Sequence, residues 1–217
     1  MPNLRVLEPP PPPPPPRRRD TRSRLLRAGI ETVEAGGYAA ASVAAIAERA
    51  GLATGTLYRH FPSKAALFVE LFRTIADAEL TAAAQAAAPL RAAAEELDAV
   101  IATFAGRALA RPRLAWALVY EPLDVQVDAE RMRYRRMYAA RLASFIRERV
   151  ESGELPDQDP DTTAAALIGG IAEALVSPLS PVAGGNADPD AVIVALTAFC
   201  RRAIGADAPS ALRAARG

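Results

Sequence analysis

The sequence predicts an all-α protein of about nine helices, with a short three-helix N-terminal domain followed by a longer helical C-terminal domain. The first reason is composition: 51% of the 217 residues are hydrophobic and 6% are aromatic, and the abundant alanine, leucine, arginine and glutamate favour helices. The second is spacing, because apolar residues recur at i, i+3, i+4 and i+7 between breaks of proline and glycine. The breaks between the first helices are too short to hold strands.

The first 19 residues are expected to form a disordered arm. Prolines fill positions 9–16, and such a run extends as polyproline II instead of entering a helix. The basic run "RRRD" comes directly after them. The arm is therefore interpreted as a spacer that ends in positive charge.

Two short helices with apolar faces follow the arm. The first places Leu26, Ile30 and Val33 at i, i+4 and i+7, and the glycines of "EAGGY" should end it. Ser42 is a suitable N-cap for the second. One face of the second helix carries Val43, Ile46, Ala47 and Ala50. Gly51 then supplies a turn conformation that a β-carbon disfavours.

Longer helices are predicted for the rest of the chain. The first runs over 64–88, and the others lie between the breaks "RPR", "EPLD", "ESGELPDQDP" and "SPLSPVAGGNADPD". Their predicted ranges are 90–110, 112–121, 129–152, 160–177 and 189–204. The last residues, 206–217, are expected to form a flexible tail.

The segment "TGTLYRHF", residues 54–61, concentrates polar aromatic and basic side chains. In a helix of about 100° per residue, Leu57 and Phe61 define its buried side. Its opposite side is formed by Gly55, Thr56 and Arg59. Tyr58 and His60 lie on the two flanks. This pattern favours a helix in the major groove of DNA, with outward residues near base edges and flanking residues near phosphates.

The preceding helix, the turn at Gly51 and this segment form a predicted helix-turn-helix. Lys64, in the first turn of the long helix, is a candidate phosphate contact. Residues 1–75 hold 11 Lys and Arg against 6 Asp and Glu, while residues 76–217 hold 15 against 19. This charge asymmetry favours a polyanion partner for the N-terminal domain. The arginines at 17–19 either enter a minor groove or only solvate the arm.

The run "SVAAIAERAGLATGTLYRHFPSKAALF" resembles the DNA-binding segment of the TetR family of bacterial transcriptional regulators, over about residues 22–72. The resemblance implies DNA contacts at Ser42, Thr54, Thr56, Tyr58, His60 and Lys64, to which the outward positions add Gly55 and Arg59. Ala53 stands where the family often has serine, so one hydroxyl contact to phosphate is missing. Arg59 replaces a histidine or other polar residue and is expected to contact either guanine or phosphate.

A two-fold dimer on a palindromic operator is expected, because one such domain contacts too little DNA for high specificity. The last two predicted helices are apolar on more than one face, and the pair Gly169 and Gly170 permits close helix approach. The candidate interface residues are Leu167, Ile171, Leu175, Val194 and Phe199. The resemblance implies a four-helix bundle between two copies, and the alternative is an ordinary core within one chain.

The resemblance also implies a small-molecule effector site in the central region. The candidate pocket residues are Phe104, Trp116, Tyr120, Met132 and Met137. Aromatic side chains with few hydroxyls suit an apolar or amphipathic effector. The basic run "RMRYRRMY" could bind an anionic effector, but a solvated helix face is favoured. Effector binding near the helix at 64–88 is expected to move its N-terminal end and so change the distance between two DNA-binding domains.

An enzyme is not expected, because the chain has one histidine, one cysteine and no metal-ligand or phosphate-cradling motif. No cofactor or metal is expected, and Cys200 is interpreted as a buried, inert thiol. Without an apolar stretch of eighteen residues free of charge and proline, we expect no membrane span and a cytoplasmic location.

The expected domains are the arm at 1–19, a DNA-binding domain at 20–66, an effector and dimerisation domain at 67–205, and the tail. The predicted function is a homodimeric repressor of the TetR type that a small molecule releases from its operator. An effector-independent DNA-binding protein is the alternative.

Overall fold

A computed structural model describes residues 16–121, 124–182 and 187–207, and every regular element in these ranges is an α-helix. The all-α prediction is confirmed. The helices are α1 (Pro16–Ala40), α2 (Val43–Arg49), α3 (Thr54–His60), α4 (Lys64–Ala87), α5 (Ala93–Ala110), α6 (Pro112–Val119), α7 (Val125–Glu151), α8 (Pro160–Leu179) and α9 (Pro189–Ile204). The predicted polyproline segment and most of the predicted tail lie outside the described residues.

Local sequence signals explain many of the helix ends. The Ser42 hydroxyl accepts a hydrogen bond from the backbone N–H of Ala45 at 3.1 Å and so caps α2. Ser63 caps α4 in the same way through Ala66 N–H at 3.0 Å. At its C-terminal end, α9 stops at Gly205, which has a left-handed φ of 73°.

The starts of two helices, α1 and α7, differ most from the sequence prediction. α1 begins at Pro16, so residues 16–19 are helical instead of belonging to the arm. At its other end the helical backbone is interrupted at Gly37 (φ 76°, ψ −176°), as the glycines of "EAGGY" predict, and one short turn follows to Ala40. α7 begins four residues earlier than expected, since the Asp124 carboxylate caps it through Gln126 N–H at 3.0 Å.

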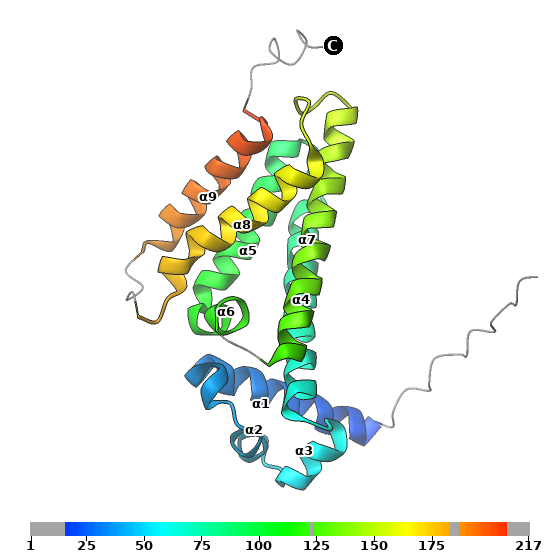
Figure 1. Cartoon of the computed structure of the whole chain (residues 1–217), viewed down its shortest axis with the longest axis vertical. Coiled ribbons are helices and arrows are strands. Elements are labelled where there is room, and N and C mark those ends of the chain that lie inside the picture. Colours follow the sequence, from blue (N-terminus) through cyan, green and yellow to red (C-terminus); the bar gives the residue numbers. More distant parts are fainter. Residues whose placement is uncertain (1–15, 122–123, 183–186, 208–217) are drawn as a thin grey trace, which may run out of the picture.

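The helices form two groups (Figure 1). α1, α2 and α3 lie together at one end of the molecule, and α4 extends from them into the body beside α7. α5, α8 and α9 pack together at the other end, where α8 also packs against α7. Each group surrounds its own cluster of buried apolar side chains.

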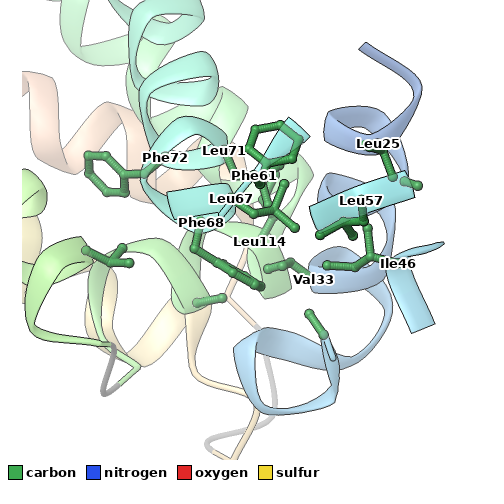
Figure 2. Packing of buried hydrophobic residues seen from close by; sticks show 14 of the residues in the cluster. Leu25, Val33, Ile46, Leu57, Phe61, Leu67, Phe68, Leu71, Phe72 and Leu114 are labelled. Atoms are coloured by element: carbon green, nitrogen blue, oxygen red, sulfur yellow. The ribbon is translucent and has the colours of Figure 1, made fainter. Parts of the chain in front are cut away.

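The N-terminal cluster holds α3 in place. Leu57 is 0% exposed and Phe61 2%, and both lie in the cluster with Leu25 of α1, Ile46 of α2 and Leu67 of α4 (Figure 2). The predicted inward pair at i and i+4 therefore anchors α3, as expected. The Arg22 guanidinium also lies 4.7 Å from the centre of the Phe61 ring.

α6 belongs to both groups. Its Leu114 and Ala117 are buried in the N-terminal cluster, whereas Ala115, Trp116 and Tyr120 at its end pack against the C-terminal cluster. α6 contacts both α1 and α8. α6 therefore joins the two clusters.

Candidate nucleic-acid interface and effector cavity

The outward surface of α3 is open. A β-carbon added to Gly55 would meet no atom within 4 Å. Thr54, Tyr58 and Arg59 are exposed, and Thr56 is half-buried. The Arg59 guanidinium donates to the Thr56 hydroxyl at 2.9 Å, so the two side chains lie together on this surface. α3 thus presents small, hydroxyl and basic groups to solvent while its other side is buried.

Two further candidates for DNA contact have partners within the chain. The Ser42 hydroxyl oxygen is used to cap α2, which leaves its hydrogen free to be donated. Its side chain is exposed. His60 is half-buried at the end of α3 and interacts with another residue.

Lys64 is held by aromatic rings, a contact that the sequence analysis missed. Its Nζ lies 4.5 Å from the centre of the Tyr38 ring and 5.4 Å from that of Phe68. These rings attract the ammonium group through their negative faces. Tyr38 belongs to the last turn of α1, so Lys64 links the end of α1 to the start of α4.

Polar contacts join α6 and its flanks to the end of α1. Arg111 forms a two-pronged ion pair with Glu34, at 2.8 and 2.7 Å. This pairing lowers the pKa of the Glu34 carboxyl. The Arg113 guanidinium donates to the carbonyl of Gly36 at 3.0 Å. The end of α1, which holds Lys64 through Tyr38, is thereby fixed to α6.

A cavity of about 380 Å³ lies between α4, α5, α6, α7 and α8. Its surface is mainly apolar. Its volume falls in the range of roughly 300–1,000 Å³ that is typical of small-molecule sites. Two of the five candidate pocket residues, Phe104 and Tyr120, line it.

The other three candidate pocket residues do not line the cavity, and the sequence prediction is wrong for them. Trp116 packs on the C-terminal cluster, with its ring centre 4.7 Å from that of Tyr120. Met132 is exposed on α7, and Met137 packs against the N-terminal cluster. The aromatic and sulfur content of a helix identifies apolar residues but does not tell which side of the helix meets the cavity.

Tyr120 also joins α6 to α8, because its hydroxyl donates to the backbone carbonyl of Ala172. Burial raises the pKa of the Tyr120 phenol to about 12. The hydroxyl therefore stays protonated and keeps this bond at neutral pH.

Arginines of α7 line the cavity, which the sequence analysis did not expect. Arg131, Arg135 and Arg141 come from or follow the basic run for which a solvated face is the favoured interpretation. Arg131 is engaged: it donates to the carbonyls of Leu118 at 2.8 Å and Glu121 at 2.9 Å. The helical spacing of these arginines with the lining residue Tyr138 could have revealed their common face.

Three of the candidate dimer residues are buried within one chain. Leu167, Ile171 and Leu175 are 1%, 5% and 2% exposed, because this face of α8 packs inside the C-terminal cluster. They are not available to a second chain, and their assignment to an interface is corrected. Val194 and Phe199 of α9 are 66% and 43% exposed.

The two central glycines of α8 also differ from each other. A β-carbon on Gly170 would lie 3.2 Å from the ring of Phe199, so this glycine permits close approach between α8 and α9 of the same chain. Gly169 faces open space.

α8 is long and apolar enough to cross a membrane by length and composition, but its row of buried leucine and isoleucine is explained by packing inside the domain. Among the described residues, no group of histidine, cysteine and carboxylate side chains could hold a metal ion.

Residues 25–71 match the family model described as "Bacterial regulatory proteins, tetR family". The repressor KstR of Mycolicibacterium smegmatis is 51% identical over 51 residues, which cover 24% of this chain and 25% of that protein. The match thus spans about a quarter of the length of that relative. The nucleoid occlusion factor SlmA of Marinobacter nauticus is 29% identical over 148 residues, or 66% of this chain and 74% of that protein.

Solved structures share the fold over most of the chain. FadR of Bacillus subtilis, solved with stearoyl-CoA, superposes with a TM-score of 0.74 at 20% identity, covering 85% of this chain and 98% of FadR. RolR, solved with resorcinol, gives a TM-score of 0.65 at 21% identity, with coverage of 93% and 96%. The helical arrangement is therefore that of FadR and RolR.

Proposed function

We propose that the chain is a transcriptional repressor of the TetR family, whose model matches residues 25–71, and that it binds DNA as a homodimer and releases it on binding a small molecule. The observation that carries the proposal is the orientation of α3: Leu57 and Phe61 are buried while Gly55 and Arg59 face solvent. A short helix anchored on one side leaves the other free to enter a major groove.

The roles of the α3 residues follow from their places. Gly55 lets the helix backbone approach the DNA closely, and Arg59 contacts a base edge or a phosphate. Tyr58 donates its hydroxyl to a phosphate from one flank. His60, Thr54, Thr56 and Ser42 complete the contact surface, and Lys64 places an ammonium group at the start of α4.

A homodimer would form through the outer faces of α8 and α9, which hold Val194 and Phe199. These exposed apolar side chains lie on one helix, and a second copy would remove them from water. Two DNA-binding domains related by a two-fold axis would then contact the two halves of a palindromic operator. Residues 20–66 would contact DNA and residues 67–205 would hold the effector and the partner.

The cavity supports an effector. Its volume, about 380 Å³, and its apolar lining suit an apolar or amphipathic small molecule, and FadR and RolR are structures solved with stearoyl-CoA and resorcinol. Such a ligand would act on α6, whose residues both line the cavity and contact the end of α1. The start of α4, which holds Lys64 against Tyr38, would shift with that end of α1.

The second candidate function is an effector-independent DNA-binding protein. The match to SlmA, a nucleoid occlusion factor, over 148 residues favours it. The cavity favours the first candidate, because apolar cavities of about this volume are typical of small-molecule sites. We propose a cytoplasmic location for either function.

Selection of bound fragments from the source genome tests the proposal. A repressor of this type enriches a few fragments that share one palindromic motif, and a gel-shift or sedimentation assay then shows two chains per site. No enrichment of any fragment would contradict DNA binding. Many dispersed sites, with affinity unaffected by every cavity ligand, would favour the second candidate.

A further inference from the structure

Resting on the proposed function, we infer that the effector is an amphipathic anion: an apolar chain that occupies the cavity and an anionic end held by Arg135 and Arg141 of α7. Both arginines line the cavity and are also exposed. They therefore stand where the cavity meets solvent.

The two arginines flank a third donor. At about 100° per residue, Tyr138 lies in the middle of the cavity face of α7, and Arg135 and Arg141 lie about 60° to either side of it. The rise of the helix places them about 9 Å apart along its axis. Two long arginine side chains at this distance can both reach the same anionic group. Burial raises the pKa of the Tyr138 phenol, so its hydroxyl stays protonated and able to donate.

None of these three donors is used within the described part of the chain. Arg135, Arg141 and the Tyr138 hydroxyl form no hydrogen bond or ion pair with any described residue. Guanidinium groups that line an apolar cavity without an acidic partner favour an anion, because charge-assisted bonds to carboxylate or phosphate are the strong ones.

The other charged groups of the cavity are already paired. Glu79 binds Arg107 through two bonds, at 2.6 and 2.9 Å, and Glu96 binds the Arg149 guanidinium. Arg111 binds Glu34 on α1. No acidic side chain of the described lining is therefore left to form an ion pair with the two arginines of α7.

The apolar lining of the cavity indicates that the rest of the ligand is an apolar chain. Its walls include Val100 and Phe104 of α5, Leu142 and Phe145 of α7 and Ile168 of α8. A small hydrophilic anion such as phosphate would leave this surface in water, whereas an alkyl chain would remove it. The matching chemistry is a chain with a carboxylate or phosphate end.

Trp116 provides a direct binding assay. It is the single tryptophan of the chain, and its ring centre lies 4.7 Å from that of Tyr120, a lining residue. Its fluorescence is titrated with decanoate, decyl phosphate, decanol and decyltrimethylammonium, and calorimetry repeats each titration. Decanoate or decyl phosphate is expected to bind at least about tenfold more tightly than decanol. The ratio of the two anions tells which head group the arginines prefer.

The variant Arg135→Gln with Arg141→Gln should abolish this preference and leave decanol binding unchanged. Arg136→Gln is the matched control, because Arg136 lies on the same helix but does not line the cavity; it should keep the preference. Equal affinity for decanol and both anions, or a preference that survives the double substitution, would overturn the inference. So would the absence of binding by all four compounds in both assays.

These titrations contain no DNA, which separates the two proposals. A chain that selects an operator but shows no preference for anions keeps the proposed function and loses this inference. A chain that prefers anions but selects no DNA keeps the ligand site and loses the function as a repressor.

Discussion

The carboxylate of Glu121 accepts a hydrogen bond from the backbone N–H of Tyr38 at 2.7 Å, across 83 positions of sequence. Glu121 lies two residues after the end of α6, and Tyr38 lies in the short turn after the bend of α1. The same Tyr38 ring holds the Lys64 ammonium group at the start of α4. One contact thus connects the helix that lines the cavity with the junction between α1 and α4.

Replacing Glu121 by alanine should weaken communication between the cavity and DNA. The Tyr38 N–H loses its acceptor, so movement of α6 pulls less directly on α1. The fold-change in operator affinity caused by decanoate is expected to fall by about threefold or more, which corresponds to part of a typical coupling energy. Gel-shift titrations with and without decanoate measure it. Glu121→Gln, which keeps an acceptor oxygen, should retain most of the effect; equal ratios in the alanine variant and the parent would contradict this route.

Gly37→Ala should destabilise the protein for two reasons. Its backbone conformation (φ 76°, ψ −176°) is adopted almost only by glycine, and an added β-carbon would lie 2.5 Å from the Glu121 carboxylate. Gly153→Ala measures the cost of a positive φ alone, because Gly153 has the same φ of 76° but nothing within 4 Å. We expect a loss of about 1 kcal/mol for Gly153→Ala and a larger loss for Gly37→Ala. Urea unfolding measures both, and equal losses would mean that Glu121 simply moves away.

These long-range contacts mark what the sequence could not predict. The helix-turn-helix was predictable because Leu57 and Phe61 stand at i and i+4 in a short polar segment, so that one side of α3 must be buried. The pairing of Glu121 with Tyr38 has no local signal, since its partners come from helices that meet only in the tertiary fold. The residue types along the sequence therefore could not predict this contact.

The errors about α8 have a related cause. α8 is apolar on more than one face, so its periodicity does not say whether a given apolar row faces the chain's own core or a partner; here Leu167, Ile171 and Leu175 face the core. On α7, Arg135 and Arg141 are exposed as their charge predicts, yet they also line the cavity. Polarity predicts exposure on average, but an amphipathic site needs charge at the edge of an apolar surface.

The Glu130 carboxylate should make stability depend on pH at the acidic end. Hydrogen bonds from Arg73 at 2.8 Å and Arg133 at 2.6 Å lower the pKa of Glu130 from 4.5 to about 2. Because the folded pKa is the lower one, this contribution is present above about pH 4.5 and is lost as the pH falls towards 2. Both guanidinium groups are half exposed, so we expect on the order of 1–2 kcal/mol.

Glu130→Gln isolates this effect from other carboxylates. The variant should be less stable than the parent at about pH 6, and the difference should shrink when urea unfolding is repeated at about pH 3. A difference that is the same at these two pH values would show that the pKa of Glu130 is the same in the folded and the unfolded chain. The ion pairs with Arg73 and Arg133 would then not lower that pKa.

Val194→Glu should prevent dimer formation without unfolding the chain. Val194 is 66% exposed on α9, so a carboxylate there is solvated in the single chain but would be buried against a second copy. Sedimentation is expected to show monomers, with an unchanged helical circular dichroism spectrum. Met132→Glu, at another exposed apolar residue on α7, should remain dimeric. A dimeric Val194→Glu variant would place the interface elsewhere.

Lys64→Met and Arg59→Ala should affect DNA binding in different ways. Lys64 is assigned to a phosphate, so its loss weakens binding to all sequences and lowers the slope of log affinity against log salt by about one unit. Methionine keeps an apolar chain against Tyr38 and Phe68, which limits any loss of packing. Arg59 is exposed in the middle of the outward surface of α3, so its loss should relax the preference at one base pair of each half-site, if it contacts a base. Fluorescence anisotropy on the selected operator and its single-base variants measures both effects. If Lys64→Met leaves affinity and salt slope unchanged, its ammonium serves only to join α1 to α4 through the aromatic rings.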